Sequence, residues 1–108
     1  MKEIEVKRVE MILLDMEGEV YQLGIGILEV IESDDLPETE KITMVKNSIK
    51  YLTELTKKLE EREECKNLER FKELIESIEA VKIRLAVNLE YLIEIEELRK
   101  LRDRLRAI

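Results

Sequence analysis

The chain has 108 residues, of which 42% are charged and 44% hydrophobic, and it carries a net charge of −7 at pH 7. That much apolar material excludes a disordered chain, and the lack of any run of ~18 apolar residues excludes a membrane-spanning helix. Glu, Lys, Leu, Ile and Val dominate, with one proline and 4% aromatic residues, a composition typical of long helices and coiled coils. We therefore expect one all-α domain over residues 1–108.

Residue types that are rare or missing limit the chemistry. The chain has no histidine and a single cysteine, Cys65, so it lacks a cysteine–histidine nucleophile and an intramolecular disulfide. No secretory leader pattern opens the sequence, and a lone thiol suits a reducing compartment, so we expect a cytoplasmic location. Few amide side chains beside abundant Lys and Glu indicate a thermophile.

The first expected element is a helix over residues 3–33. Two rows of apolar residues each repeat every seven positions, and the position two after the first row is always polar, which is an amphipathic helical pattern. The apolar rows are Val6, Leu13, Val20 and Ile27, and Val9, Met16, Leu23 and Val30. A β-hairpin turning at Glu17–Gly18 is the alternative, because apolar and polar residues alternate from Tyr21 to Ile27.

Gly24 and Gly26 stand two positions apart in this segment, as at the start of a dinucleotide-binding fingerprint. Glu29 replaces the third glycine of that fingerprint, and the segment ends too soon for the helix that would receive a pyrophosphate. On a helical wheel Gly24 falls within the apolar arc, so we predict a close approach of another helix there. Gly26 lies towards the polar side, where we find no packing role for it.

The second expected helix covers residues 36–64. Asp35 is a candidate N-cap with Glu38 three residues later, and Pro37 suits a first turn. The apolar stripe has helical spacing and consists of Ile42, Val45, Ile49, Leu52, Leu55 and Leu59. Residues 60–67 then contain no large apolar side chain, which predicts a turn near Cys65–Asn67 with Asn67 as the next cap. A helix that continues through this segment is the alternative.

The third expected helix covers residues 67–107. Its apolar row widens between Ala80 and Ile95 until it covers most of the circumference, and such a helix needs more than one neighbour. At 1.5 Å per residue the segment would be ~60 Å long against ~40 Å for the second helix, so its end should extend past the bundle unless it breaks near Asn88. We therefore predict a homo-oligomer, most simply a two-fold dimer, through Val81, Leu85, Leu89, Leu92 and Ile95.

A basic cluster follows at the end of the chain, formed by Arg99, Lys100, Arg102, Arg104 and Arg106. Such a cluster suits phosphate contact in a nucleic-acid-associated protein. We favour the alternative that these cations complement the C-terminal end of the helix dipole and pair with acidic residues near the end of the first helix, namely Glu29, Glu32, Asp34 and Asp35. The remainder of the chain is acidic and would repel a polyanion.

Glutamates gather at residues 60–64 and again at Glu90, Glu94 and Glu97. Oxygen ligands so placed suit Mg²⁺, as in the all-α nucleotide pyrophosphohydrolases, which pair two Glu-rich helices. That chemistry needs a Glu-x-x-Asp arrangement, but Lys100 stands three residues before Asp103. A solvated face with Glu–Lys pairing is the simpler interpretation.

Together these patterns predict an antiparallel bundle of three long amphipathic helices, or of four with a break near Asn88, with coiled-coil-like packing. We expect a non-enzymatic structural or protein-interaction module that associates with itself, with another protein as a further candidate partner. The residues assign no catalytic group, cofactor or metal site, and we expect neither a membrane nor, in preference to protein, a nucleic acid as the partner.

Overall fold

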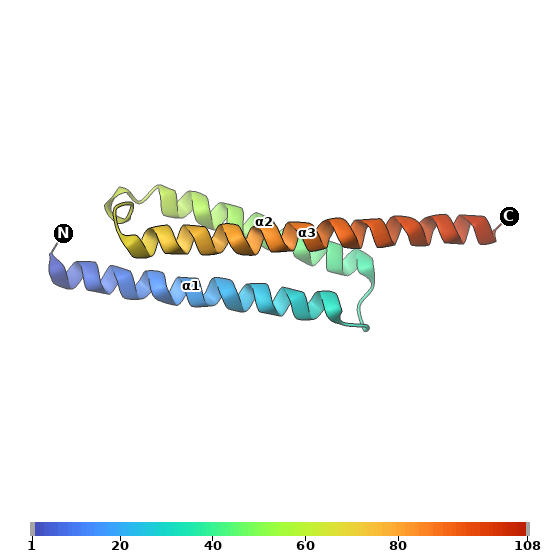
Figure 1. Ribbon diagram of the computed structural model, residues 1–108, viewed down its shortest axis with the longest axis horizontal. Helices are drawn as coiled ribbons and strands as arrows, with labels where there is room; N and C mark the ends of the chain where they lie inside the picture. Colours follow the sequence, from blue (N-terminus) through green and yellow to red (C-terminus); the bar gives the residue numbers. More distant parts are fainter. Residues whose placement is uncertain (1, 108) are drawn as a thin grey trace.

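The protein is all-α in the computed structural model, which describes residues 2–107. Three long helices pack against one another: α1 (Glu3–Glu32), α2 (Glu38–Glu60) and α3 (Glu69–Arg106), with a short 3-10 helix, η1 (Glu63–Cys65), before α3. Along the molecule α1 runs in one direction, α2 returns, and α3 runs back beside both (Figure 1). The all-α prediction is confirmed. The hairpin alternative is wrong, because α1 continues unbroken through Glu17, Gly18 and both later glycines.

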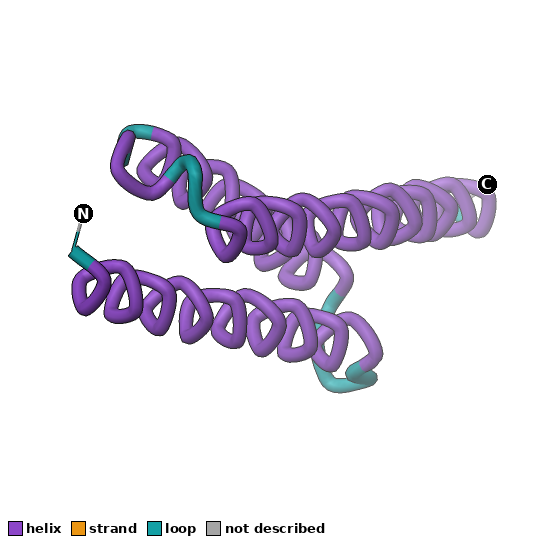
Figure 2. Tube along the Cα trace, turned by 60° about the vertical axis from the view of Figure 1, so that its left-hand side comes forward, coloured by secondary structure: helices purple, strands orange, loops and turns teal. Residues whose placement is uncertain are grey.

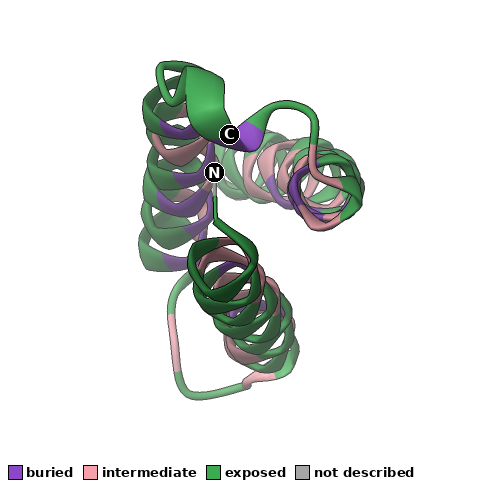
Figure 3. Cartoon of the chain, turned by 90° about the vertical axis from the view of Figure 1, so that its left-hand side faces the viewer, coloured by how far each residue is buried: buried purple, intermediate pink, exposed green. Residues whose placement is uncertain are grey.

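The molecule is a rod with extents of 72 × 22 × 15 Å. α1 and α2 each pack mainly against α3 and touch one another much less. Seen end on, the buried positions face the space between the helices, and the exposed positions cover the outside (Figure 3). The central element of the bundle is therefore α3, because both α1 and α2 pack against it.

The core repeats every seven residues on all three helices. The buried residues that follow this repeat are Leu13, Val20 and Ile27 on α1, Val45, Leu52 and Leu59 on α2, and Phe71, Ile78, Leu85 and Leu92 on α3. Seven residues are close to two helical turns, so each set lies along one side of its helix. Burying each such side chain stabilises the fold by about 1.5–3 kcal/mol before the cost of chain ordering.

The end of α3 extends beyond the connection between α1 and α2 (Figure 1). Every residue from 97 to 107 is exposed, which confirms the extension predicted from the helix lengths. α3 passes through Asn88 without a break, and the Asn88 Nδ2 donates a hydrogen bond of 2.8 Å to the Arg84 carbonyl oxygen one turn earlier. The predicted break near Asn88 is wrong, and residues 2–107 contain no fourth long helix.

The connection between α1 and α2 differs from the predicted capping box. The Asp35 amide donates to the Ser33 Oγ at 3.2 Å, and no side chain caps α2, which begins one residue after Pro37. The Pro37 carbonyl accepts the first intrahelical bonds, from the amides of residues 40 and 41. The local Ser33 turn and the fixed φ of proline thus set the start of the helix, and Asp35 lies too early to cap it.

The connection between α2 and α3 confirms the predicted turn near Cys65–Asn67 (Figure 2). The helices are shorter here than predicted, since α2 ends at residue 60 and α3 begins at residue 69. Asn67 is not the cap, because the N-cap residue is Leu68 and its position carries no side-chain cap bond. Cys65 is only 6% exposed and belongs to the core cluster, so its small side chain is part of the packing at this end of the bundle.

Candidate interaction surface

The five residues predicted to join protomers lie largely within the chain's own packing. Leu85 and Leu92 are buried, at 1% and 3% exposure. Val81 and Leu89 are partly buried and pack against the core cluster, and Ile95 is also partly buried. This row of α3 therefore faces α1 and α2, and it offers little free apolar surface to a second copy.

A different row of α3 is apolar and exposed. We call it the α3 outer face, and it consists of Ala80, Ile83, Val87, Tyr91, Leu98, Leu101 and Leu105. Its six large members are between 48% and 65% exposed. Their helical spacing places them on one side of α3, and the row continues to the end of the extension.

A second exposed apolar row runs along α1. We call it the α1 outer face, and it consists of Ile4, Met11, Leu14, Tyr21 and Ile25, with Gly18 between them. The five apolar residues are between 47% and 74% exposed. Steps of seven, three, seven (through Gly18) and four residues keep them on one side of the helix, away from the buried row of Leu13, Val20 and Ile27.

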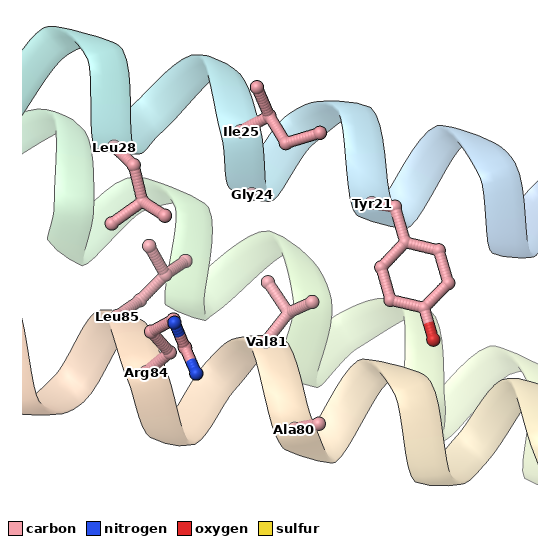
Figure 4. A pocket seen from close by; sticks show the side chains of 8 residues that line it. All are labelled: Tyr21, Gly24, Ile25, Leu28, Ala80, Val81, Arg84 and Leu85. Carbon is pink, nitrogen blue, oxygen red and sulfur yellow. The ribbon is translucent and has the colours of Figure 1, made fainter.

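A groove of ≈ 300 Å³ lies between α1 and α3, and one edge of each outer face borders it. Its lining consists of Tyr21, Gly24, Ile25 and Leu28 from α1, and Ala80, Val81, Arg84 and Leu85 from α3 (Figure 4). Apart from the Arg84 guanidinium and the Tyr21 hydroxyl, the side chains that line it are apolar. A groove of this kind fits an apolar helix face better than a polar metabolite.

Gly24 lets α3 come close at the floor of this groove. A Cβ at Gly24 would lie 3.2 Å from the Val81 Cγ1, which is tighter than ordinary van der Waals contact. The neighbour of Gly24 is thus a side chain of α3, Val81, and not the α3 backbone. A Cβ at Gly26 would meet no atom within 4 Å, so this glycine has no packing role among the described residues.

A polar chain lies beside the groove. The Ser77 Oγ donates to the Glu17 Oε1 at 3.0 Å and lies 2.9 Å from the Tyr21 hydroxyl. Because serine has one hydroxyl hydrogen, the Tyr21 hydroxyl is the donor in the second bond. The Glu17 Oε2 is buried and has no hydrogen-bond partner within residues 2–107. A buried carboxylate oxygen ordinarily has a donor, so this one is an exception beside the groove.

The basic end of α3 is exposed, and little of it is paired. Arg99 forms an ion pair with Glu38 at the start of α2, and Arg102 forms one with its neighbour Asp103, at 3.3 Å. Within residues 2–107, Arg104 and Arg106 make no ion pair. The predicted pairing with Glu29, Glu32, Asp34 and Asp35 is wrong, because α3 extends past the end of α1 and meets the first turn of α2 instead.

The glutamate clusters are not brought together as a magnesium site would require. Residues 60–64 lie at the α2–η1 connection, whereas Glu90, Glu94 and Glu97 are exposed in the second half of α3. Across residues 2–107, no three cysteine or carboxylate side chains gather where they could hold a metal ion. In the same range, no helix combines the length and apolar character needed to span a bilayer.

No protein-family model, curated protein or solved structure matches this chain. The two outer faces and the groove between them are the features of the molecule that bear on a function. Sequence reasoning missed these faces because it treated the broad apolar band of α3 as one row. One sequence feature distinguishes the outer row from the buried row: the outer row continues through Leu98 and Leu101 to Leu105, beyond the last buried residue of α3.

Proposed function

We propose that this protein is a non-enzymatic structural or protein-interaction module that self-associates through the outer faces of α1 and α3. One observation carries the proposal: two adjacent helices expose apolar rows at helical spacing, and an apolar groove lies between the two helices. Large contiguous apolar patches on isolated proteins are uncommon and mark sites of association. The proposed interface therefore contains the exposed row of α3, and not the buried row that the sequence pattern predicts.

The architecture that we propose for the protomer is an antiparallel three-helix bundle with coiled-coil-like packing. The seven-residue repeat of the buried positions on each helix supports it, since that repeat keeps an apolar seam facing a neighbouring helix along its length. The reversal of chain direction at both connections supports the antiparallel order (Figure 1). A rod of this kind presents its outer faces over a long distance, which suits lateral association.

Contact with nucleic acid through Arg99, Arg102, Arg104 and Arg106 is the second candidate function. Exposure of all four residues on the extension favours it. Against it, Leu98, Leu101 and Leu105 occupy the same extension, and the chain as a whole carries a charge of −7. Absence of salt-dependent binding to duplex or single-stranded oligonucleotides at low ionic strength would remove this candidate.

Light scattering of two glutamate variants tests the proposed function. Val87→Glu places a charge on the α3 outer face, and Tyr51→Glu places the same charge at an exposed apolar position on α2. We expect the wild type and Tyr51→Glu to show at least twice the 12.8 kDa chain mass at micromolar concentration. Val87→Glu should shift towards 12.8 kDa with an unchanged helical circular dichroism spectrum. A wild type that is monomeric, or a Val87→Glu variant as large as the wild type, would contradict the proposal.

A further inference from the structure

We infer that the occupant of the α1–α3 groove is the α3 extension of a second copy, held antiparallel, so that each chain covers the other's outer face. This inference rests on the self-association proposed above and names its geometry. We define the extension as residues 98–107, all of which are exposed. It carries the three outer-face leucines furthest from the protomer's own core: Leu98, Leu101 and Leu105.

Charge favours the antiparallel arrangement. The extension has five basic residues and one acidic residue, whereas α1 has eight acidic and two basic residues. An antiparallel pair places each basic extension beside the partner's acidic α1. A parallel pair would instead bring two extensions of like charge together at one end, where repulsion is unfavourable.

The spacing of the α3 outer face restricts the register. With Arg84 and Glu94 included, positions 80, 84, 87, 91, 94, 98, 101 and 105 advance by alternating steps of four and three. In an antiparallel pair the residue numbers rise along one helix and fall along the other. The steps of four and three on the two helices therefore match only in registers whose paired residue numbers differ in sum by a multiple of seven. The groove spans Ala80–Leu85 on α3. Among the matching registers, one places the three leucines of the partner's extension over the middle of this span.

In that register Leu105 faces the partner's Ala80, and Leu98 faces the partner's Val87. The two-fold axis crosses α3 at the level midway between residues 92 and 93, and all three leucines of the extension lie against the partner. Ala80 is the smallest residue of the outer face, so it leaves space for a leucine opposite. The inferred pairing thus places a large side chain over a small one at the mouth of the groove.

The register also places a basic side chain of the partner near the Glu17 carboxylate. Glu17 bonds to Ser77 of α3, and the register places the partner's Arg106 about one helical turn or less from the level of Ser77. An arginine side chain there carries the charge and the donors that the unpartnered Glu17 Oε2 lacks within residues 2–107. Apolar fit, net charge and the level of Arg106 beside the Glu17–Ser77 pair therefore favour one arrangement.

Disulfide trapping tests the register. In a Cys65→Ala background, one chain carries Ala80→Cys, and a second, tagged chain carries Leu105→Cys; both positions are exposed, and circular dichroism checks that both variants remain helical. Residues 80 and 105 lie ~37 Å apart along one helix, so any disulfide between these positions joins two chains. After mixing and mild oxidation we expect the Ala80→Cys/Leu105→Cys pair to form at least about tenfold more than either self-pair, because proximity raises its effective concentration.

The outcomes separate this inference from the proposed function. Efficient self-pairing of Leu105→Cys would show a parallel arrangement and overturn the inference. A dimer by light scattering with no preference for the mixed pair would also overturn it, while leaving the proposed self-association in place. A wild-type chain that is monomeric by light scattering would overturn both.

Discussion

The buried and outer rows of α3 contrast within a single helix. Leu85 and Val87 are two residues apart, yet Leu85 is 1% exposed and Val87 is 62% exposed. Both belong to apolar rows with helical spacing, so hydrophobicity alone does not distinguish a residue that holds the fold from one that is free to bind. What separates them is the position of α1 and α2, which cover one side of α3 and leave the other side open.

The largest expected effect is a loss of stability on truncating a residue of the buried row, which we compare with the same truncation in the outer row. Leu85→Ala should lower the free energy of unfolding by about 2–5 kcal/mol, because it leaves a cavity in a fully packed row. Val87→Ala should lower it by about 1 kcal/mol or less in the protomer, because most of that side chain is already in water. Urea denaturation of both variants at a concentration low enough to favour the monomer measures the difference. Equal losses would mean that the two rows do not differ as described.

Two of the three glycines of α1, Gly24 and Gly26, provide the next test. Gly24→Leu should destabilise the protein by about 1–3 kcal/mol, since its side chain would press on Val81 at the groove floor. Thermal unfolding measures the loss, and combining the change with Val81→Ala should restore part of it. Wild-type stability in Gly24→Leu would remove the close approach from this account.

Gly26→Ala is the matched substitution and should act in the opposite direction. A Cβ there meets no atom within 4 Å, and alanine is preferred over glycine inside a helix by about 1 kcal/mol. We therefore expect a gain in stability of up to about 1 kcal/mol, measured in the same unfolding experiment. A loss of stability would reveal a packing role that the free space around Gly26 does not show.

The smallest expected effect concerns the boundary between the bundle and the extension. Arg99→Gln removes the ion pair with Glu38, which ties α3 to the start of α2. We expect a loss of about 1 kcal/mol or less, reduced further by added salt, because the Arg99 side chain is partly exposed. A comparable loss in Arg104→Gln would contradict the distinction drawn between a paired and an unpaired arginine.

Much of the fold follows from sequence periodicity. The apolar rows of α1 and α2 predict the helices that the structure contains, and the polar stretch before Leu68 predicts the turn. Helix starts were predicted less well, because Asp35 and Asn67 have suitable cap chemistry but local hydrogen bonds place each helix start a few residues later. The sequence also does not determine whether α3 continues through Asn88, because asparagine is found both at helix caps and inside helices.

The surface was predicted only in outline. The width of the apolar band on α3 correctly indicated more than one neighbour, but the predicted interface residues Leu85 and Leu92 belong to the core. Two rows with the same seven-residue repeat share that band, and only the packing of α1 and α2 decides which row turns inward. The pairing of Arg99 with Glu38 was missed for a related reason, because it depends on how far α3 extends past α1.

The most direct test of the account asks whether the outer row of α3 is covered in the assembled protein. Hydroxyl-radical footprinting across a range of protein concentrations reads the exposure of single side chains, with Tyr51 on α2 as the internal reference. The account predicts that oxidation of Val87, Leu98 and Leu101 falls as the concentration rises, while oxidation of Tyr51 stays constant. Oxidation of the outer row that is independent of concentration, in a chain of 12.8 kDa solution mass, would contradict it.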